Sequence, residues 1–441
     1  MRFSMANHVE RRQDSGQVLV LFVLSVIVLI LFIGLGVDLG FSYITQAQLS
    51  KAVDAAALTA ARNISLGTNT ATQVALNAFA NNYGVSSRDV TDPKVVVQIF
   101  SDANNNEVVS INATVSINTF FIRVLPQWAT LTVASSAQAT RDNVIMTLVL
   151  DTSGSMAPRH GAPPGGDGTG SGGGQFLPGA VTAFVNNFDE NHDKAAMVSF
   201  NTIQSNVFYG GFPSQPISPF QQPIIDAVNA FVWTNATFSQ GGLTNALILE
   251  NNATIPAGQA VAKVVVFCTD GFANVVQGTF DCPPETVINF GGQDINSEGV
   301  GVVDDGCGFY DPTTGIILPG DNNGKCFLDE GGSPSCCPGV SGFQSANNGM
   351  QPFLRANVSA DATVRAIQVA NQMRANGIIV YSIGVGGSID PVFLAQIAND
   401  PSSPNYVATS FDGEFVVAND PSTLGAVFQT IASKILLRLS K

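Results

Sequence analysis

The sequence predicts an α/β fold, namely a doubly wound, mostly parallel sheet preceded by a single transmembrane helix and a small α+β module. From residue 144 onward, apolar runs of strand length alternate with helical segments, which favours parallel β-α-β units. An uncharged apolar stretch near the N-terminus has the length of a membrane span, and β-branched runs follow it. The predicted parts are a cytoplasmic N-terminus (1–16), a transmembrane and continuing helix (17–63), a spacer module (64–143), and an α/β domain (144–441) with a Gly-rich insertion at 157–174 and a Cys-containing insertion at 272–357.

Composition limits the classes of function. A chain of 441 residues is long enough for two or three domains, and 45% hydrophobic with only 12% charged residues argues against long disorder. The formal net charge of −14 argues against a nucleic-acid partner, which would need a basic face. An acidic domain is instead suited to holding a cation.

The N-terminal apolar stretch is predicted to anchor the protein in the membrane. Residues 17–37 carry no charge, and their length at helical rise is about 30 Å, the thickness of the hydrocarbon core. A cleaved signal peptide is the alternative, but its apolar core would be about 7–15 residues long. Arg2, Arg11 and Arg12 precede the stretch and no Lys or Arg follows it before Lys51. The positive-inside rule then predicts a single-pass inner-membrane (cell-membrane) protein, with its N-terminus cytoplasmic and its C-terminal bulk extracytoplasmic.

The helix is expected to continue to Arg62, because the following residues are rich in Ala and lack Pro. The segment resembles the N-terminus of TadE/TadG-like proteins of Tad (Flp) pilus-assembly systems. Substrates of the type IV prepilin peptidase usually carry Glu five residues after the cleaved Gly, a position held here by Leu21, so we expect a permanently anchored component. A plain anchor without a pilus link is the alternative. The matching residues are Gly16-Gln17, Gly36-Val37-Asp38-Leu39-Gly40, Gln48-Leu49 and Asp54-Ala55-Ala56-Ala57-Leu58.

Residues 64–143 are predicted to form a small module of one helix and three strands that spaces or packs the neighbouring parts. No set of chemically reactive residues stands out in it. The helix is expected at 71–82, the strands at 95–100, 108–117 and 129–139, and a hairpin loop at 102–106, where Asn and Asp tolerate turn geometry.

A candidate metal site follows the first strand of the α/β domain. The apolar run that begins at Val144 ends in Asp151, and Ser153 and Ser155 follow at alternate positions. Open α/β sheets bind ligands beyond the carboxyl ends of their strands, so these side chains are expected at the binding edge. A carboxylate and two hydroxyls form a hard oxygen set that suits Mg²⁺, Ca²⁺ or Mn²⁺. A capped helix start without a metal is the alternative.

This motif resembles the metal-ion-dependent adhesion site of von Willebrand factor type A domains, whose signature is Asp-x-Ser-x-Ser. That family adds a Thr from a second loop and an Asp from a third. Gly241-Gly242-Leu243-Thr244-Asn245 resembles the Thr loop, and a buried-strand run ending in Thr269-Asp270-Gly271 resembles the Asp loop. The resemblance implies a von Willebrand factor A (Rossmann-like) fold in which an acidic side chain of a protein ligand or of a pilus or envelope subunit completes the metal coordination. The implied ligands are Asp151, Ser153, Ser155, Thr244 and Asp270.

The rest of the α/β domain is predicted from alternating periodicity. Helices are expected at 176–188, 220–231, from Thr244 onward, 360–376, 391–398 and 421–439, and strands at 194–200, 207–212 (weaker), 261–268, 377–385 and 406–408.

The two insertions have different compositions. Residues 157–174, with His160 and Asp167, are expected to be a Gly-rich linker or a segment that shapes the metal site. Residues 272–357 contain most of the cysteines, which in an oxidising compartment favour disulfide bridges over a zinc site. Short Asp/Asn-Gly segments there are expected to be turns rather than calcium loops. The cysteines are Cys268, Cys282, Cys307, Cys326, Cys336 and Cys337, and the sequence leaves their pairing open.

Three functional hypotheses follow. The first is cation-dependent adhesion or subunit docking outside the cell. The second is a structural pilus-assembly or envelope component whose metal is only structural. An enzyme is not expected, because the sequence has no P-loop and its His8, His160 and His192 lack a paired carboxylate in sequence.

Overall fold

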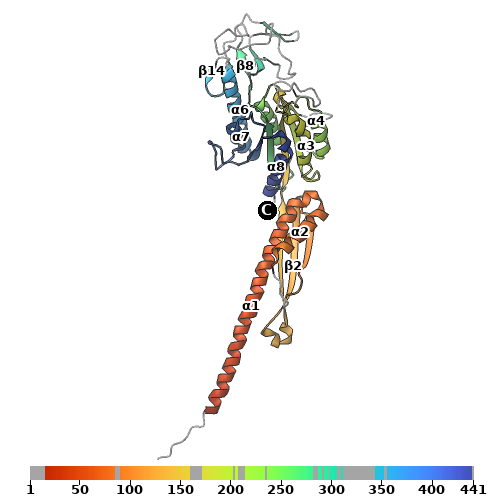
Figure 1. The fold of residues 1–441 in the computed structure, drawn as a ribbon, viewed down its shortest axis with the longest axis vertical. Helices are drawn as coiled ribbons and strands as arrows, with labels where there is room; N and C mark the ends of the chain where they lie inside the picture. Colours follow the sequence, from red (N-terminus) through yellow and green to blue (C-terminus); the bar gives the residue numbers. More distant parts are fainter. Residues whose placement is uncertain are drawn as a thin grey trace, which may run out of the picture. The chain divides into compact units, whose positions relative to one another are not determined.

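The computed structural model describes residues 15–84, 90–158, 171–201, 204–206, 214–233, 236–281, 287–290, 293–296, 298–304, 309–310, 343–351 and 355–439 (Figure 1). The chain divides into two compact units. Unit 1 extends to Phe100 and resumes at Val108–Thr140, whereas unit 2 comprises Ser101–Glu107 and Arg141–Lys441. The turn between the first two strands therefore belongs to unit 2.

Unit 1 begins with the long helix α1 (Ser15–Asn63), drawn in red to orange in Figure 1. Its first half exposes an apolar surface, and among the described residues it is the single helix long and apolar enough to cross a membrane. Its second half is different, because Leu49, Ala52 and Ala56 are completely buried. One continuous helix thus supplies both the predicted anchor and part of a globular core.

The core of unit 1 forms where α1 packs against a helix and a three-stranded sheet. Small Ala side chains on α1 and α2 let the two helices approach closely, and alternate residues of β2 point into the core. The elements after α1 are η1 (Ile64–Leu66), α2 (Thr68–Asn82), β1 (Lys94–Ser101), β2 (Glu107–Asn118), η2 (Ile122–Val124), η3 (Pro126–Trp128) and β3 (Thr130–Arg141), with sheet order β1-β2-β3.

Unit 2 contains a six-stranded sheet of order β16-β15-β7-β4-β5-β6. Neighbouring strands are parallel except for β6, which pairs antiparallel with β5. The chain moves outward from β4 on one side, then returns to place β7 on the other side of β4, so the winding reverses between these two strands. The strands are β4 (Asn143–Asp151), β5 (Lys194–Phe200), β6 (Gln204–Asn206), β7 (Val261–Thr269), β15 (Ile378–Val385) and β16 (Phe415–Ala418).

Helices cover both faces of this sheet, as expected for a doubly wound fold. Alternate residues of β4 face opposite sides: Leu148 and Leu150 join the core under α3, α4 and α8, whereas Val149 joins the core under α5, α6 and α7. The first group is α3 (Gly173–Val185), α4 (Gln221–Asn229) and α8 (Leu424–Leu439), the second α5 (Ser239–Asn252), α6 (Arg355–Ala375) and α7 (Pro391–Ala398), with 3₁₀ turns η4 (Gly154–Met156) and η5 (Pro421–Thr423). The predicted fold class is confirmed.

Three predicted elements of unit 2 differ from the structure. Helix α5 begins at Ser239 rather than at Thr244, because the Gly241-Gly242 pair lies inside the helix. The expected strand at 406–408 is a turn, and the edge strand is β16 instead. Strand β6 precedes the weaker strand expected at 207–212, which lies outside the described residues.

The Cys-containing insertion carries short strands of its own. They pair as β8-β11-β12, β9-β10 and β13-β14. Cys268 is a free, buried thiol on β7, and the other five cysteines lie outside the described residues, as do His8, His160 and Asp167. The strands are β8 (Val275–Asp281), β9 (Val287–Phe290), β10 (Gln293–Asn296), β11 (Glu298–Asp304), β12 (Phe309–Tyr310), β13 (Phe343–Ser345) and β14 (Gly349–Gln351).

Candidate metal centre

The candidate site lies where the winding of the sheet reverses. Asp151 is the last residue of β4, and Asp270 directly follows β7, the parallel neighbour of β4. Doubly wound sheets bind ligands at this position, beyond the carboxyl ends of the two diverging strands. The sheet register therefore brings together two carboxylates that are more than a hundred residues apart in sequence.

A chain of hydrogen bonds connects the predicted ligands. The Ser155 hydroxyl donates to Asp270 Oδ1 at 2.7 Å, and the Ser153 and Ser155 hydroxyl oxygens are 2.9 Å apart. The Ser153 backbone N–H donates to Asp151 Oδ1 at 2.7 Å, which fixes the turn after β4. Thr269 donates a hydroxyl hydrogen bond to the other oxygen of Asp151. Asp151, Ser153, Ser155 and Asp270 are thus assembled as the sequence predicts.

Both carboxylates are removed from solvent. Asp151 is completely buried and Asp270 is 2% exposed. Burial and the nearby charge of Asp270 together raise the pKa of Asp151 to about 7, against opposing hydrogen bonds from Ser153 and Thr269. Burial likewise raises the pKa of Asp270, against hydrogen bonds from Ser171 and Ser155. Two buried acids this close are unfavourable as a pair of anions unless a cation accompanies them.

The polar atoms around the site fit a hard divalent cation. Asp270 Oδ2 is buried without a hydrogen-bond partner among the described residues, and so is the Ser239 hydroxyl at the start of α5. Neither Asp151 nor Asp270 forms an ion pair with a described Lys, Arg or His. Unpaired buried carboxylate oxygens normally have a reason, and a metal ion is a common one. Carboxylate and hydroxyl oxygens match Mg²⁺, Ca²⁺ or Mn²⁺.

The fifth predicted ligand is placed differently. Thr244 is half-buried in the second turn of α5, and no described hydrogen bond connects it to the other four residues. Thr237 lies beside them instead and is 4% exposed. A Cβ atom built on Gly271 would be 3.8 Å from Thr237 Oγ1 and 3.7 Å from Ser155 Oγ, so both hydroxyls border the same point. Sequence reasoning missed Thr237, which carries no distinctive local motif.

Local packing explains why Thr237 reaches the site. The Thr237 N–H donates to the side chain of Asn274 at 2.7 Å, and the Asn274 N–H donates to the Thr237 carbonyl at 3.2 Å, so the segment before α5 is fastened to the segment after Asp270. Within α5, a Cβ on Gly242 would be 2.8 Å from the Phe200 ring and 3.0 Å from Val149. Only a glycine allows α5 to approach the sheet this closely.

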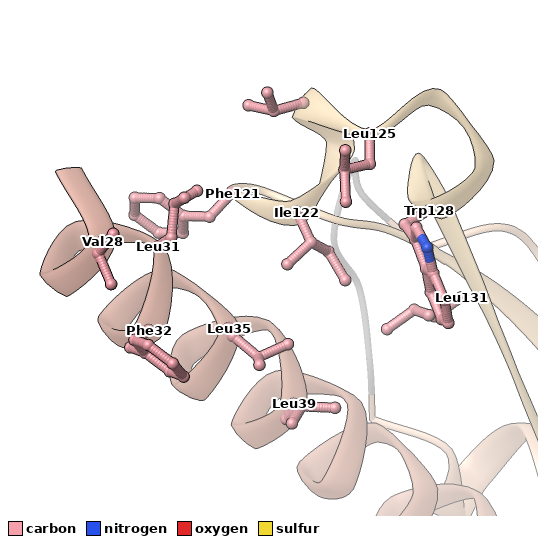
Figure 2. A pocket seen from close by; sticks show the side chains of 11 residues that line it. Val28, Leu31, Phe32, Leu35, Leu39, Phe121, Ile122, Leu125, Trp128 and Leu131 are labelled. Carbon is pink, nitrogen blue, oxygen red and sulfur yellow. The ribbon is translucent and has the colours of Figure 1, made fainter. Parts of the chain in front are cut away.

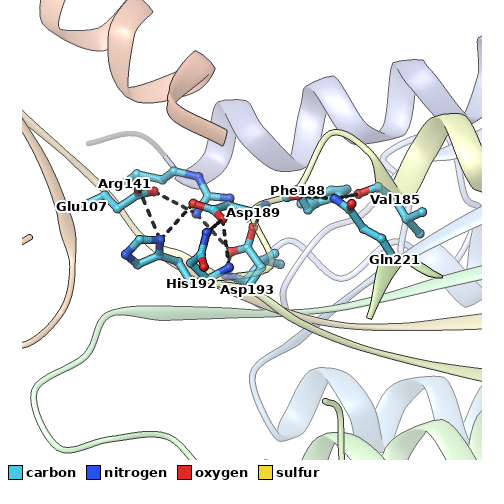
Figure 3. A network of polar contacts seen from close by, with 10 residues as sticks. Glu107, Arg141, Val185, Phe188, Asp189, His192, Asp193 and Gln221 are labelled. Atoms are coloured by element: carbon cyan, nitrogen blue, oxygen red, sulfur yellow. Dashed lines mark hydrogen bonds and ion pairs between the residues drawn. The ribbon is translucent and has the colours of Figure 1, made fainter. Parts of the chain in front are cut away.

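A second polar cluster in unit 2 also has a metal-like composition. Single ligand atoms of Glu107, Asp189 and His192 lie within 4.8 Å of one another (Figure 3). The Arg141 guanidinium is already there, however, 3.6 Å from Glu107 and in a two-pronged contact with Asp193 at 3.0 and 2.6 Å. A fixed guanidinium thus supplies the positive charge, and we interpret the cluster as a buried ion-pair network.

The titration of this network supports that interpretation. Burial acts to raise the pKa of Asp189, but hydrogen bonds from His192 and Asn191 outweigh it and hold that pKa at about 2. The hydrogen bond to Asp189 raises the pKa of His192. A protonated His and an ionised Asp therefore favour each other, whereas a metal would require a neutral imidazole.

Solved structures similar to this chain include bacterial pilus proteins. The PilB minor pilin from Streptococcus sanguinis is 15% identical, with a TM-score of 0.39 and 79% of each chain covered. The von Willebrand factor domain of the type V pili tip protein Mfa5 from Porphyromonas gingivalis is 15% identical, with a TM-score of 0.37, covering 68% of this chain and 97% of that one.

A third similar structure comes from outside bacteria. Proximal thread matrix protein 1 from the mussel byssus, with a zinc-occupied MIDAS motif, is 15% identical with a TM-score of 0.34. The alignment covers 67% of this chain and 46% of the mussel protein, so this chain spans about half of that protein's length. No curated protein matches the sequence.

The N-terminal helix matches a family model. The match covers residues 16–63, which coincides with α1 almost end to end. Unit 2 adds a doubly wound sheet, with Asp151 and Asp270 at its winding reversal. Residues 16–63 of the chain match the family model described as "Putative Flp pilus-assembly TadE/G-like".

Proposed function

We propose that this protein is a membrane-anchored pilus-assembly or adhesion component whose unit 2 binds a protein partner through a divalent cation. The observation that carries the proposal is the pair of buried carboxylates, Asp151 and Asp270, at the carboxyl ends of the neighbouring strands β4 and β7, with the Ser155 hydroxyl donating to Asp270. Ser153 and Thr237 would complete the protein's share of oxygen ligands. The TadE/G-like helix supports the assignment to pilus biology.

A bound cation would supply charge neutralisation and an open coordination position. Mg²⁺ demands octahedral geometry and usually keeps several waters, so a site with few protein carboxylates leaves room for a ligand from outside. Ser155 is exposed while Asp151 is fully buried, which orients the accessible side of the site toward solvent. An acidic side chain of a partner is the chemistry that such a position would accept.

The direct test is Mn²⁺ binding by the full chain in lipid nanodiscs, followed by electron paramagnetic resonance. We expect one site from which Mg²⁺ displaces Mn²⁺, and we expect Asp151→Asn and Asp270→Asn to abolish it. Wild-type protein that binds no Mn²⁺ at millimolar concentration would contradict the proposal.

A matched pair of variants identifies the hydroxyl ligand. Thr237→Val removes a hydroxyl at the site and should weaken Mn²⁺ binding by about tenfold, equivalent to roughly 1.4 kcal/mol for one lost interaction. Thr244→Val is the same change seven positions later, within α5, and should leave the affinity unchanged. The reverse outcome would assign the ligand to Thr244.

Partner binding is tested with the same protein. We expect capture of pilus or envelope proteins from the source cells in Mg²⁺ and its loss in EDTA or with Asp151→Asn. The alternative function, a structural component with a structural metal, is favoured by the match of α1 alone and predicts capture that survives Asp151→Asn. Protease shaving of intact cells checks the proposed orientation, in which unit 2 is extracytoplasmic at the inner membrane.

A further inference from the structure

The loop between β2 and β3 is unusually apolar for a connecting segment. Residues 119–129, here called the apolar loop, contain one charged residue, Arg123. Val124 is 75% exposed and Trp128 is 49% exposed, and Phe120, Phe121 and Leu125 are also exposed. Soluble proteins rarely gather so many exposed apolar side chains in one short loop, and such patches mark contact surfaces.

This loop lies against the membrane-spanning part of α1. Together they enclose a groove of about 480 Å³ (Figure 2), within the size range of pockets that hold small apolar molecules. Leu31 and Leu35 line it from the helix, and Phe121, Leu125 and Trp128 line it from the loop. The groove is therefore continuous with the lipid-facing surface of the predicted span.

Two residues of α1 hold the loop in place. A Cβ atom on Gly34 would be 2.5 Å from the Phe121 side chain, so the absence of a side chain at Gly34 permits the contact. One helical turn later, Asp38 is 2% exposed and accepts three backbone N–H groups of the loop, those of Phe120 at 2.7 Å, Phe121 at 3.0 Å and Ile122 at 2.8 Å. The loop is thus a fixed part of the helix surface.

The backbone of the loop is also largely satisfied internally. Besides the three N–H groups bound by Asp38, those of Thr119, Leu125 and Trp128 donate to carbonyls within the loop at 3.1, 3.0 and 2.8 Å. Pro126 has no N–H to satisfy. Irregular backbone is tolerated at membrane depth only when its polar groups have partners, so this hydrogen bonding meets the requirement for burial in lipid.

The helix sets the depth at which the loop would lie. The uncharged span ends at Val37, and Gly34 lies three residues inside that end, about 5 Å at helical rise. The Phe121 side chain that contacts Gly34 is then below the outer boundary of the hydrocarbon. Trp128 suits the interface, where Trp is enriched, and Arg123 can extend its charge to the headgroups.

We propose that the apolar loop inserts into the outer leaflet beside α1, as a second membrane contact whose partner is the acyl chains of the bilayer. The proposal rests on anchoring by α1 and is independent of the metal site. A single helix leaves rotation about its own axis free, whereas a helix and an adjacent loop that both enter the bilayer fix which face of unit 1 points toward the membrane.

The test is quenching of tryptophan fluorescence by lipids brominated on their acyl chains, using the full chain in nanodiscs. The chain has two tryptophans, so Trp233→Phe leaves Trp128 as the only reporter. Because Trp128 is 49% exposed, we expect brominated lipid to quench its fluorescence.

Two controls use the same background with Trp128→Phe. Phe100→Trp places the reporter at a 45% exposed site near the end of β1, next to the turn that leads into β2. The length of β2, about 40 Å, separates that turn from the loop, so this reporter should not be quenched. Phe32→Trp places it on α1 within the span, at a 69% exposed position, and should be strongly quenched.

The outcomes separate the loop from the anchor. Quenching of Trp128 and of the Phe32→Trp reporter, without quenching of the Phe100→Trp reporter, supports insertion. Quenching confined to the Phe32→Trp reporter overturns it and assigns the groove to a protein partner. An unquenched Phe32→Trp reporter overturns both the anchoring and the inference drawn from it.

Discussion

Replacing Asp151 by Asn should stabilise the metal-free protein, although it removes the central metal ligand. The pKa of Asp151 is raised to about 7 from an ordinary value of 3.8 by burial and by the charge of Asp270. A folded-state pKa above the unfolded one contributes stability that is present below pH 3.8 and is lost as pH rises through 7. The difference of about 3 pH units corresponds to about 4 kcal/mol.

The side chain of Asn can keep the local hydrogen bonds. Its oxygen accepts the Ser153 N–H that Asp151 Oδ1 now accepts, and its amide can donate to the Thr269 hydroxyl. At pH 8 in EDTA, we therefore expect the free energy of unfolding of Asp151→Asn to be higher than that of the wild type by several kcal/mol, and by at most about 4 kcal/mol. Mg²⁺ at about one thousand times Kd should offset this difference, because only the wild type gains the binding free energy, which is then about 4.1 kcal/mol.

The assay is urea unfolding of the full chain in nanodiscs, read by fluorescence of Trp233 in a Trp128→Phe background. Trp233 reports on unit 2, because it packs beside Gly174. Measured from pH 4 to 7, the wild type should lose about 1.4 kcal/mol per pH unit relative to Asp151→Asn. Parallel pH profiles, or a variant less stable than wild type at pH 8 in EDTA, would refute the argument that Asp151 is held ionised at a cost.

Three further predictions concern the framework of unit 2. Burial raises the pKa of Glu250 to about 8, so the wild type loses stability as pH rises from 4.5 to 8. In urea unfolding at pH 8, Glu250→Gln should therefore have a free energy of unfolding about 4–5 kcal/mol higher than the wild type. Equal pH profiles for the two proteins would contradict this. Arg141→Met leaves Asp193 buried without its ion-pair partner and should lower the free energy of unfolding by about 3–5 kcal/mol. Adding Asp193→Asn should recover most of this loss. A loss below about 1 kcal/mol for Arg141→Met would show that the pair is not needed. Gly242→Ala places a methyl group 2.8 Å from the Phe200 ring. The variant should lower the free energy of unfolding by about 1–3 kcal/mol and weaken Mn²⁺ binding. Unchanged stability would mean that α5 has room to move.

Much of the fold was predictable because its strongest signals are local. Strand β5 coincides with the predicted 194–200, since a mostly buried strand is a short apolar run. Helix α7 coincides with 391–398, where Pro391 occupies the first turn and Asp390 accepts the N–H groups of Val392 and Phe393 as an N-cap. In both cases, the residues that set the ends are adjacent to the element.

The edge strand β16 was not predicted because a side chain outside both candidate segments, that of Asn399, determines which segment joins the sheet. Residues 406–408 and 415–418 are equally short and apolar, and the first were predicted as the strand. The side-chain amide of Asn399 binds both backbone groups of Val407, accepting from its N–H at 2.9 Å and donating to its carbonyl at 3.0 Å. Those groups are then unavailable to a sheet, and β15 pairs with β16 instead.

The proposed hydroxyl ligand, Thr237, raises the same difficulty. A Gly-Gly pair in sequence favours a turn, which places Thr244 just after the turn and at the start of a helix. In the folded protein, Gly242 lies within α5 and allows this helix to pack closely on Phe200. The helix has therefore already begun at Ser239, and the threonine in the loop before it is Thr237. Nothing within the segment distinguishes the two threonines, because the distinction depends on how close the helix lies to the sheet. A glycine that permits such an approach therefore locates the loop residue before the helix better than the Gly-Gly pattern does.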